Sequence, residues 1–212
     1  ANCKTLRRVV LEEGMKTVPK YLCANGNSIT TVIIPSTVTA IDDYAFYGCN
    51  GLKTDIPSTV KRIGDYAFCG CDNLKIESLP ERIENIGEKA FAGCPYIKRL
   101  IFPESLSKIG AYAFYDCTGL EEISFHKYNG YQVGLNIGDG VFEGCTSLKT
   151  VKLEKGLYEI GCKAFAECDA LESLILPENV ISLGYHMIQN TSIQSITIPH
   201  NVNSCGKYGE DG

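Results

Sequence analysis

Eleven cysteines and three histidines are the residues of this chain whose chemistry is most distinctive. Structural zinc is held by four such side chains, usually supplied as pairs at fixed spacing. Cys69 and Cys71, and Cys162 and Cys168, are the closest approach to such pairs. Disulfides are the other possibility, although an odd number of cysteines cannot all pair within one chain. Both have to be weighed against a purely structural role for the thiols.

The three histidines, His126, His186 and His200, give little support for catalysis, because none stands next to a plausible nucleophile. The chain also lacks a dinucleotide-binding glycine motif, a phosphate-binding loop, a His-Glu-x-x-His sequence and a nucleophile elbow. A pair of carboxylates acting as acid and base stays open as an alternative, because Asp and Glu are plentiful. We predict that the protein is not an enzyme and has no cofactor and no metal site.

The cysteines follow a repeat that runs through almost the whole chain. An Ala-Phe or Val-Phe pair recurs with a cysteine three residues after the phenylalanine, and successive phenylalanines are 22, 23, 23, 28 and 23 residues apart. These positions are Phe46, Phe68, Phe91, Phe114, Phe142 and Phe165, with Cys49, Cys71, Cys94, Cys117, Cys145 and Cys168. We predict a ladder of buried thiols that pack as small apolar groups. Outside the ladder, Cys3, Cys69, Cys162 and Cys205 are expected to be more exposed and easier to oxidise.

Each unit of the repeat has three parts. An alternating apolar run ending in proline, as at Leu174 to Pro177, predicts a strand of about four residues. An Ile-Gly pair such as Ile63-Gly64 follows, where glycine is expected to permit a backbone angle that other residues disfavour. The Asp-Tyr-Ala-Phe-x-Gly-Cys segment then predicts a tight helical or 3₁₀ turn. The predicted strands end near Leu11, Ile34, Ile56, Leu79, Phe102, Phe125, Leu153, Leu176 and Ile198.

A unit of this size cannot bury its own apolar face, so the units must stack. We predict an α/β-type solenoid, mostly β, of about 8–9 coils of about 23 residues, forming a single domain over residues 1–212. The longest step between phenylalanines contains a loop insertion at residues 127–132. Residues 203–212 are expected to form a polar C-terminal tail.

The repeat resembles the BspA-like class of leucine-rich repeats, over about nine-tenths of the chain. The resembling residues are Leu171-x-x-Leu174-x-Leu176-Pro177-x-x-Val180-x-x-Leu183-Gly184, joined to Ala164-Phe165-x-x-Cys168. The resemblance implies right-handed coils with short parallel strands, and a cell-surface or secreted protein that binds host proteins or matrix. Two departures predict local irregularity: Glu77 stands where an inward apolar residue is expected, and Cys23 replaces the first phenylalanine.

The outward positions of the predicted strands should line up from coil to coil and form a candidate binding face. This face consists of Arg8, Val10, Thr31, Ile33, Arg99, Ile101, Glu122, Ser124, Thr150, Lys152, Ser173 and Ile175. β-Branched residues are favoured in strands in any case, so a plain solvent-facing sheet is the alternative. The loop insertion, with Tyr128, Asn129 and Tyr131, is a second candidate because tyrosine is enriched at interfaces, although many such loops are only tolerated.

The composition excludes several other classes. The formal net charge of −5 argues against a nucleic-acid partner. No apolar run reaches the roughly 18 to 20 residues of a membrane span, and the chain begins without signal-peptide features. We therefore predict a non-enzymatic protein-binding or adhesion module with a host protein, matrix or glycan partner. The alternative is a structural spacer of a larger surface protein, and the apolar run from Leu6 to Leu11 also suggests end-to-end self-association.

Overall fold

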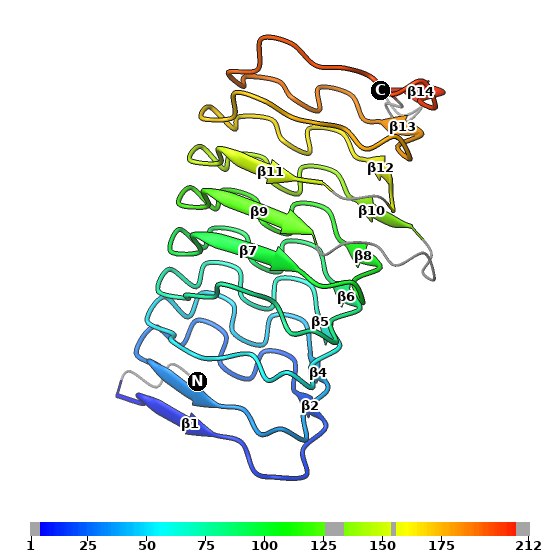
Figure 1. The fold of residues 1–212 in the computed structure, drawn as a ribbon. Coiled ribbons are helices and arrows are strands. Elements are labelled where there is room, and N and C mark those ends of the chain that lie inside the picture. Colours follow the sequence, from blue (N-terminus) through cyan, green and yellow to red (C-terminus); the bar gives the residue numbers. More distant parts are fainter. Residues whose placement is uncertain (1–4, 126–133, 154–155, 207–212) are drawn as a thin grey trace, which may run out of the picture.

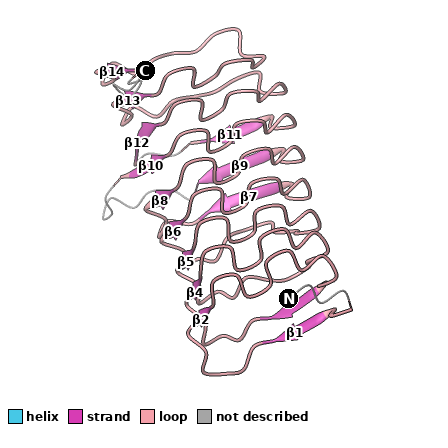
Figure 2. Ribbon diagram, turned by 180° about the vertical axis from the view of Figure 1, so that it is seen from behind, coloured by secondary structure: helices cyan, strands magenta, loops and turns pink. Residues whose placement is uncertain are grey.

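The computed structural model describes residues 5–125, 134–153 and 156–206. These residues wind into about eight coils, each about 23 residues long and each lying on the one before (Figure 1). Strand pairing occurs at two places in a coil, so two lines of parallel strands run along the stack (Figure 2). The solenoid predicted from the repeat is therefore the fold of the chain.

The first line contains the strands that the sequence predicts from its alternating apolar runs. β1 (Arg8–Val10) pairs with β3 (Thr31–Ile33), and β7 (Arg99–Phe102), β9 (Glu122–Phe125) and β11 (Thr150–Lys152) form a three-stranded sheet. The predicted strands that end at Ile56, Leu79, Leu176 and Ile198 are not formed. In the coil that ends at Ile56, the Thr54 hydroxyl donates to the carbonyl of Val32 at 2.7 Å, so a side chain makes the link between coils.

The expected irregularity at Glu77 has a simple form. Glu77 and Ser78 are exposed, while Ile76 and Leu79 are buried at 8% and 3% exposure. The carboxylate thus avoids the core, and Ile76 takes the inward place that the repeat assigned to residue 77. The alternation needed for strand pairing is lost in that coil.

The second line of strands is not predicted by the sequence. It is a nine-stranded parallel sheet in which most strands have only two residues. Its members are β2 (Thr17–Val18), β4 (Ala40–Ile41), β5 (Arg62–Ile63), β6 (Asn85–Ile86), β8 (Lys108–Ile109), β10 (Leu135–Ile137), β12 (Leu157–Ile160), β13 (Ser182–Leu183) and β14 (Ser204–Cys205). β14 includes the beginning of the segment expected to be a polar tail, and it pairs with β13.

The glycine that follows these strands has a different role from the predicted one. Gly64, Gly87 and Gly110 do not have the positive φ that favours glycine. A Cβ atom on Gly87 would lie 2.5 Å from the Asp65 carboxylate and 2.6 Å from the backbone carbon of Gly64. The coils approach so closely here that only glycine fits, so packing and not backbone freedom fixes the residue.

The turn segment is not helical, because none of the described residues forms a helix. Its backbone N–H groups alternate between two kinds of acceptor. Phe46 N–H donates to Ala67 of the next coil at 2.8 Å, whereas Tyr47 N–H donates within the turn to Tyr44 at 3.2 Å. Tyr44 has a φ of 56°, which interrupts any helix and directs every second N–H to the neighbouring coil.

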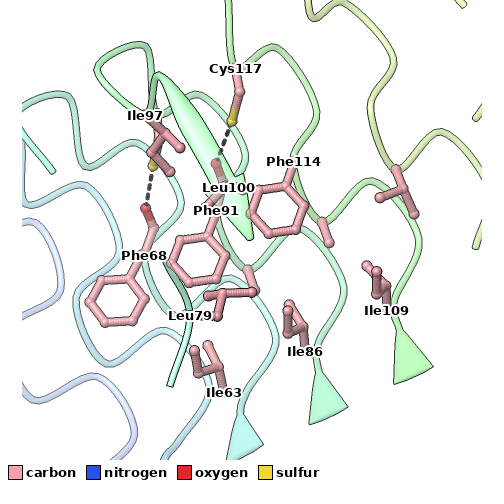
Figure 3. Close-up of a cluster of buried hydrophobic side chains, with 14 of the residues drawn as sticks. Ile63, Phe68, Leu79, Ile86, Phe91, Ile97, Leu100, Ile109, Phe114 and Cys117 are labelled. Carbon is pink, nitrogen blue, oxygen red and sulfur yellow. Dashed lines mark hydrogen bonds between the residues drawn. The ribbon is translucent and has the colours of Figure 1, made fainter. Parts of the chain in front are cut away.

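The phenylalanines of the repeat stack along the centre of the solenoid. Phe91 lies 5.3 Å from Phe68 and 5.2 Å from Phe114 between ring centroids, with the rings within 5° of parallel (Figure 3). All three side chains are fully buried. Each ring is thus in contact with the coil below and the coil above.

The six thiols of the cysteine ladder are buried, and they also make a bond that the sequence does not predict. Each donates to the carbonyl at the phenylalanine position of the preceding coil. Cys94 Sγ lies 3.3 Å from Phe68 O, and Cys117 Sγ lies 3.2 Å from Phe91 O (Figure 3). Cys23, which replaces phenylalanine in the first coil, keeps this link by accepting from Cys49 at 2.9 Å.

Burial also sets the protonation of these thiols. It raises the pKa of Cys117 and of Cys168 to about 12, and it raises the pKa values of Cys94 and Cys145 well above the ordinary value. The desolvated thiolate is disfavoured, so the groups keep the proton that they donate to the neighbouring coil.

Candidate binding surface

The strand register brings the predicted binding-face residues together in two groups. Arg8 lies beside Thr31, and Val10 lies beside Ile33. In the three-stranded sheet, one row is Arg99, Glu122 and Thr150, and the next is Ile101, Ser124 and Lys152. Two coils without strand pairing on this side separate the groups. Ser173 and Ile175 lie in the coil after β11, where they are exposed.

Apolar side chains on this face differ in exposure. Ile175 is 82% exposed, Val10 58% and Ile33 42%. Ile101, which the repeat predicts to be equally open, is half-buried. The preceding coil lies against it there, since Leu79 N–H donates to Ile101 O at 3.4 Å. Solvent-facing isoleucines are therefore present at two separated places on the face.

A charged cluster occupies the centre of the face. The Glu122 carboxylate accepts from the Lys152 ammonium at 2.7 Å and pairs with the Arg99 guanidinium at 3.0 Å. The hydrogen bond from Lys152 holds the pKa of Glu122 below its usual value. A hollow of about 400 Å³ lies here, lined by Glu77, Lys98, Arg99, Glu121, Glu122, Lys149 and Thr150. The cluster is largely exposed, so its ion pairs contribute little to stability.

The predicted face did not include a row of lysines that lies on the same side of the solenoid. Lys53, Lys75 and Lys98 each follow the inward Leu or Ile of their coil, and all three are exposed. The signal was present in the repeat, because each of the three follows that residue directly in consecutive units. Sequence reasoning took only the two outward positions nearest the proline and so passed over it.

Tyrosines form a second row that the sequence reasoning missed. Tyr44 stacks on Tyr21 and Tyr66 with centroids 5.0 and 4.8 Å apart. In the next coil Lys89 takes the tyrosine position, and its ammonium lies 5.5 Å from the rings of both Tyr66 and Tyr112. The row covers the turn side of the coils, where it stabilises the stack through aromatic and cation–π contacts.

The loop candidates Tyr128, Asn129 and Tyr131, with His126 and the rest of the insertion, lie outside the described residues. Of the other two histidines, His200 is exposed and His186 stacks on Tyr185 at 3.6 Å between ring centroids. Within the described residues, His186 and Cys205 line one hollow of about 470 Å³, and the His186 ring nitrogen pairs with the Gln189 side chain.

The cysteines outside the ladder are scattered. Cys69 and Cys162 are half-buried and Cys205 is exposed, while Cys3 lies outside the described residues. Every cysteine in the described part of the chain is free of a disulfide. No group of three or more His, Cys, Asp or Glu side chains in that part is placed to hold a metal ion. Cys71 lies in the buried ladder, whereas Cys69, two residues earlier, is half-buried.

The described ranges contain no helix with the length and apolar character that crossing a membrane requires. The coils enclose one continuous apolar core and have rows of side chains on the outside. This is the architecture of a leucine-rich-repeat solenoid. The model of the BspA type leucine-rich repeat region matches residues 1–53, 39–133 and 135–209 in 6 copies. The chain therefore belongs to the BspA-type leucine-rich repeat family, whose members generally mediate protein–protein interactions.

Solved structures agree with this assignment. A leucine-rich repeat protein of T. pallidum (TpLRR) is 29% identical, with a TM-score of 0.67 over 77% of each chain. A leucine-rich cell surface protein from Faecalibacterium prausnitzii A2-165 is 25% identical, with a TM-score of 0.55 over 99% of this chain and 62% of that one. No curated protein sequence matches the chain.

Proposed function

We propose that the chain, as one solenoid over residues 1–212, is a non-enzymatic binding module of a cell-surface or secreted protein. A protein partner from a host surface or matrix would bind to the candidate binding face. The observation that carries the proposal is the exposure of isoleucine and valine on a rigid face. Ile175 at 82% and Val10 at 58% are open to solvent beside rows of charged side chains, as at an interface with apolar anchors and a polar surround.

The cell-surface placement has separate support. One of the similar structures is of a protein described as a leucine rich cell surface protein. The rigidity of the scaffold favours binding as well, because a preformed surface loses little conformational freedom on association. A spacer with no binding site is the competing proposal, and the same continuous core would serve it.

The test compares one face variant with one control of the same chemistry. Immobilised matrix proteins, each assayed separately, are probed with the wild-type chain, with Ile175→Asp, and with Ile181→Asp. Ile181 is also exposed, at 36%, but it is not part of the candidate binding face. We expect Ile175→Asp to weaken binding at least tenfold and Ile181→Asp to leave it within twofold. Absence of binding by the wild-type chain, or equal loss in both variants, would favour the spacer.

A further inference from the structure

The lysine row, defined as Lys53, Lys75 and Lys98, runs along the stack on the strand side. Its members occupy equivalent positions in three consecutive coils. Backbone pairing fixes the two ends of the row, since Lys53 N–H donates to Thr30 O at 2.9 Å and Glu121 N–H donates to Lys98 O at 2.9 Å. The three ammonium groups therefore stand on neighbouring coils of a rigid surface.

The row is poorly neutralised. Lys98 is 3.9 Å from the Glu121 carboxylate, a long distance for an ion pair. The Lys75 ammonium lies 5.7 Å from the centre of the Tyr96 ring, and no carboxylate among the described residues comes within ion-pair distance of Lys53. Like charges at facing positions of neighbouring strands destabilise a sheet. The Lys75–Tyr96 contact and the long Lys98–Glu121 pair offset only part of the repulsion among the three ammonium groups, so an external anion would stabilise the row.

The surrounding charge favours the same conclusion. The chain has a net charge of −5, but the excess of acid lies in one half. Residues 1–106 have 13 Lys and Arg against 12 Asp and Glu, whereas residues 107–212 have 7 against 13. Arg7 and Arg8 extend the basic surface two coils below Lys53. The acidic residues nearest in sequence are Asp55 and Glu77. Each comes two residues after a lysine of the row, Asp55 after Lys53 and Glu77 after Lys75.

The spacing of the row identifies the kind of anion. Stacked rings one coil apart are separated by 4.8 Å for Tyr44–Tyr66 and 5.3 Å for Phe68–Phe91, which measures the rise per coil. An extended peptide repeats its side chains on one face about every 6.6 Å and falls out of step with the coils. One sugar ring of an extended polysaccharide is about as long as the coil rise. A chain with an anionic group on each sugar therefore stays in step with the coils even where successive sugars turn these groups to alternate sides, because the same side then recurs every second coil.

We propose that the lysine row, with Arg7 and Arg8, binds a sulfated polysaccharide chain lying along the solenoid axis. This inference deepens the proposed function, because it uses the same side of the solenoid and rests on that side being a binding surface. The Lys98 end opens onto the hollow of about 400 Å³, where Arg99 is a further cation, whereas Lys149 at the far side of the hollow lies among Glu121 and Glu122 and is not part of the row. Release of counterions from the polyanion drives such binding and makes it depend strongly on salt.

The test uses a fluorescent heparin octasaccharide and the full chain, with anisotropy measured from 50 to 200 mM salt. Lys75→Gln removes the centre of the row. Lys149→Gln is the matched control, because Lys149 holds the same position in its coil but lies between Glu121 and Glu172. We expect Lys75→Gln to weaken binding about three- to tenfold and to reduce the salt slope by about one. Lys149→Gln should stay within twofold of wild type.

Three results would overturn the proposal. These are no binding of heparin at 50 mM salt, equal effects of the two substitutions, and equal binding of a polyglutamate with the same number of charges, which would identify an acidic polypeptide as the ligand. Ile175→Asp separates this proposal from the protein-binding one. It should weaken capture of a matrix protein at least tenfold and leave heparin binding unchanged, so each proposal can fail alone.

Discussion

Alkaline pH should destabilise this protein through the cysteine ladder. The buried thiols keep their protons in the folded chain, as the pKa of about 12 for Cys117 and Cys168 shows. A thiol in the unfolded chain ionises near pH 8.5. Between these values the unfolded state binds fewer protons than the folded state. The free energy of unfolding must therefore fall as the pH rises from about 8.5 toward the folded pKa. Below about pH 8 these thiols are protonated in both states and do not change it.

The size of the effect follows from the same shifts. Each fully protected thiol lowers the free energy of unfolding by about 1.4 kcal/mol per pH unit, or about 2 kcal/mol between pH 8 and pH 10. Cys94 is completely enclosed, between coils on both sides, and its pKa lies well above the ordinary value. Replacing Cys94 by alanine removes the contribution of one thiol. Between pH 8 and pH 10 the free energy of unfolding of Cys94→Ala should therefore fall by about 2 kcal/mol less than that of the wild type.

The assay is urea unfolding followed by far-ultraviolet circular dichroism at pH 8 and pH 10, with a phosphine reductant to prevent thiol oxidation. Cys94→Ala lowers stability at both pH values because it leaves a cavity, but only the difference between the two pH values reports the thiol. Cys205→Ala is the control, because that exposed thiol meets water in both states. An identical pH dependence of Cys94→Ala and wild type would refute the ladder as a set of protected thiols.

Four further substitutions test other parts of the fold by urea unfolding. Phe91→Ala should cost about 3–5 kcal/mol, because the ring is fully buried and stacked on both sides, and a neutral effect would mean that the assigned register is wrong. Gly87→Ala should cost at least about 3 kcal/mol, since its Cβ would overlap backbone atoms of the preceding coil. Gly93→Asn should cost less than about 1 kcal/mol, because asparagine tolerates its φ of 67°; similar losses in the two glycine variants would contradict the distinction. Lys89→Ala should cost roughly 1 kcal/mol, because it removes two cation–π contacts. Lys108→Ala is the comparison, and equal stability of the two variants would show that these contacts do not stabilise the fold.

The repeat in the sequence was sufficient to predict the solenoid and its inward residues. Phe91 and Cys94 recur at fixed spacing because every coil must fill the same cross-section. The second line of strands could not be found in this way. A two-residue strand such as β5 (Arg62–Ile63) has no local period, and it exists only because the neighbouring coils supply partners for its backbone. Pairing between distant residues, not local pattern, defines this sheet.

The error about glycine and the unpredicted hydrogen bond of the thiols share one physical origin. Gly87 is explained by the distance to the coil below, and the Cys94 thiol by a carbonyl in that coil. Both depend on atoms 22 to 26 residues away, whose positions follow from the stacking and not from the neighbouring sequence. The candidate face was easier to predict, since alternation along a strand sets which residues point outward. Its detail was not, because the half-burial of Ile101 depends on the irregular coil before it.

The same dependence between coils shows where specific function can lie in such a protein. A change at an inward position affects the coils on both sides, so the core is held to one pattern from Phe46 to Phe165. Outward rows lack this constraint, and each can change composition from coil to coil at little cost to the fold. A run of like charges in consecutive coils, such as Lys53 to Lys98, is not what packing favours, because alternation with Glu, as at Glu121 and Lys149, lowers the repulsion; the row is therefore the part of the surface that we propose to serve a ligand. Such a row points to selection by something outside the chain.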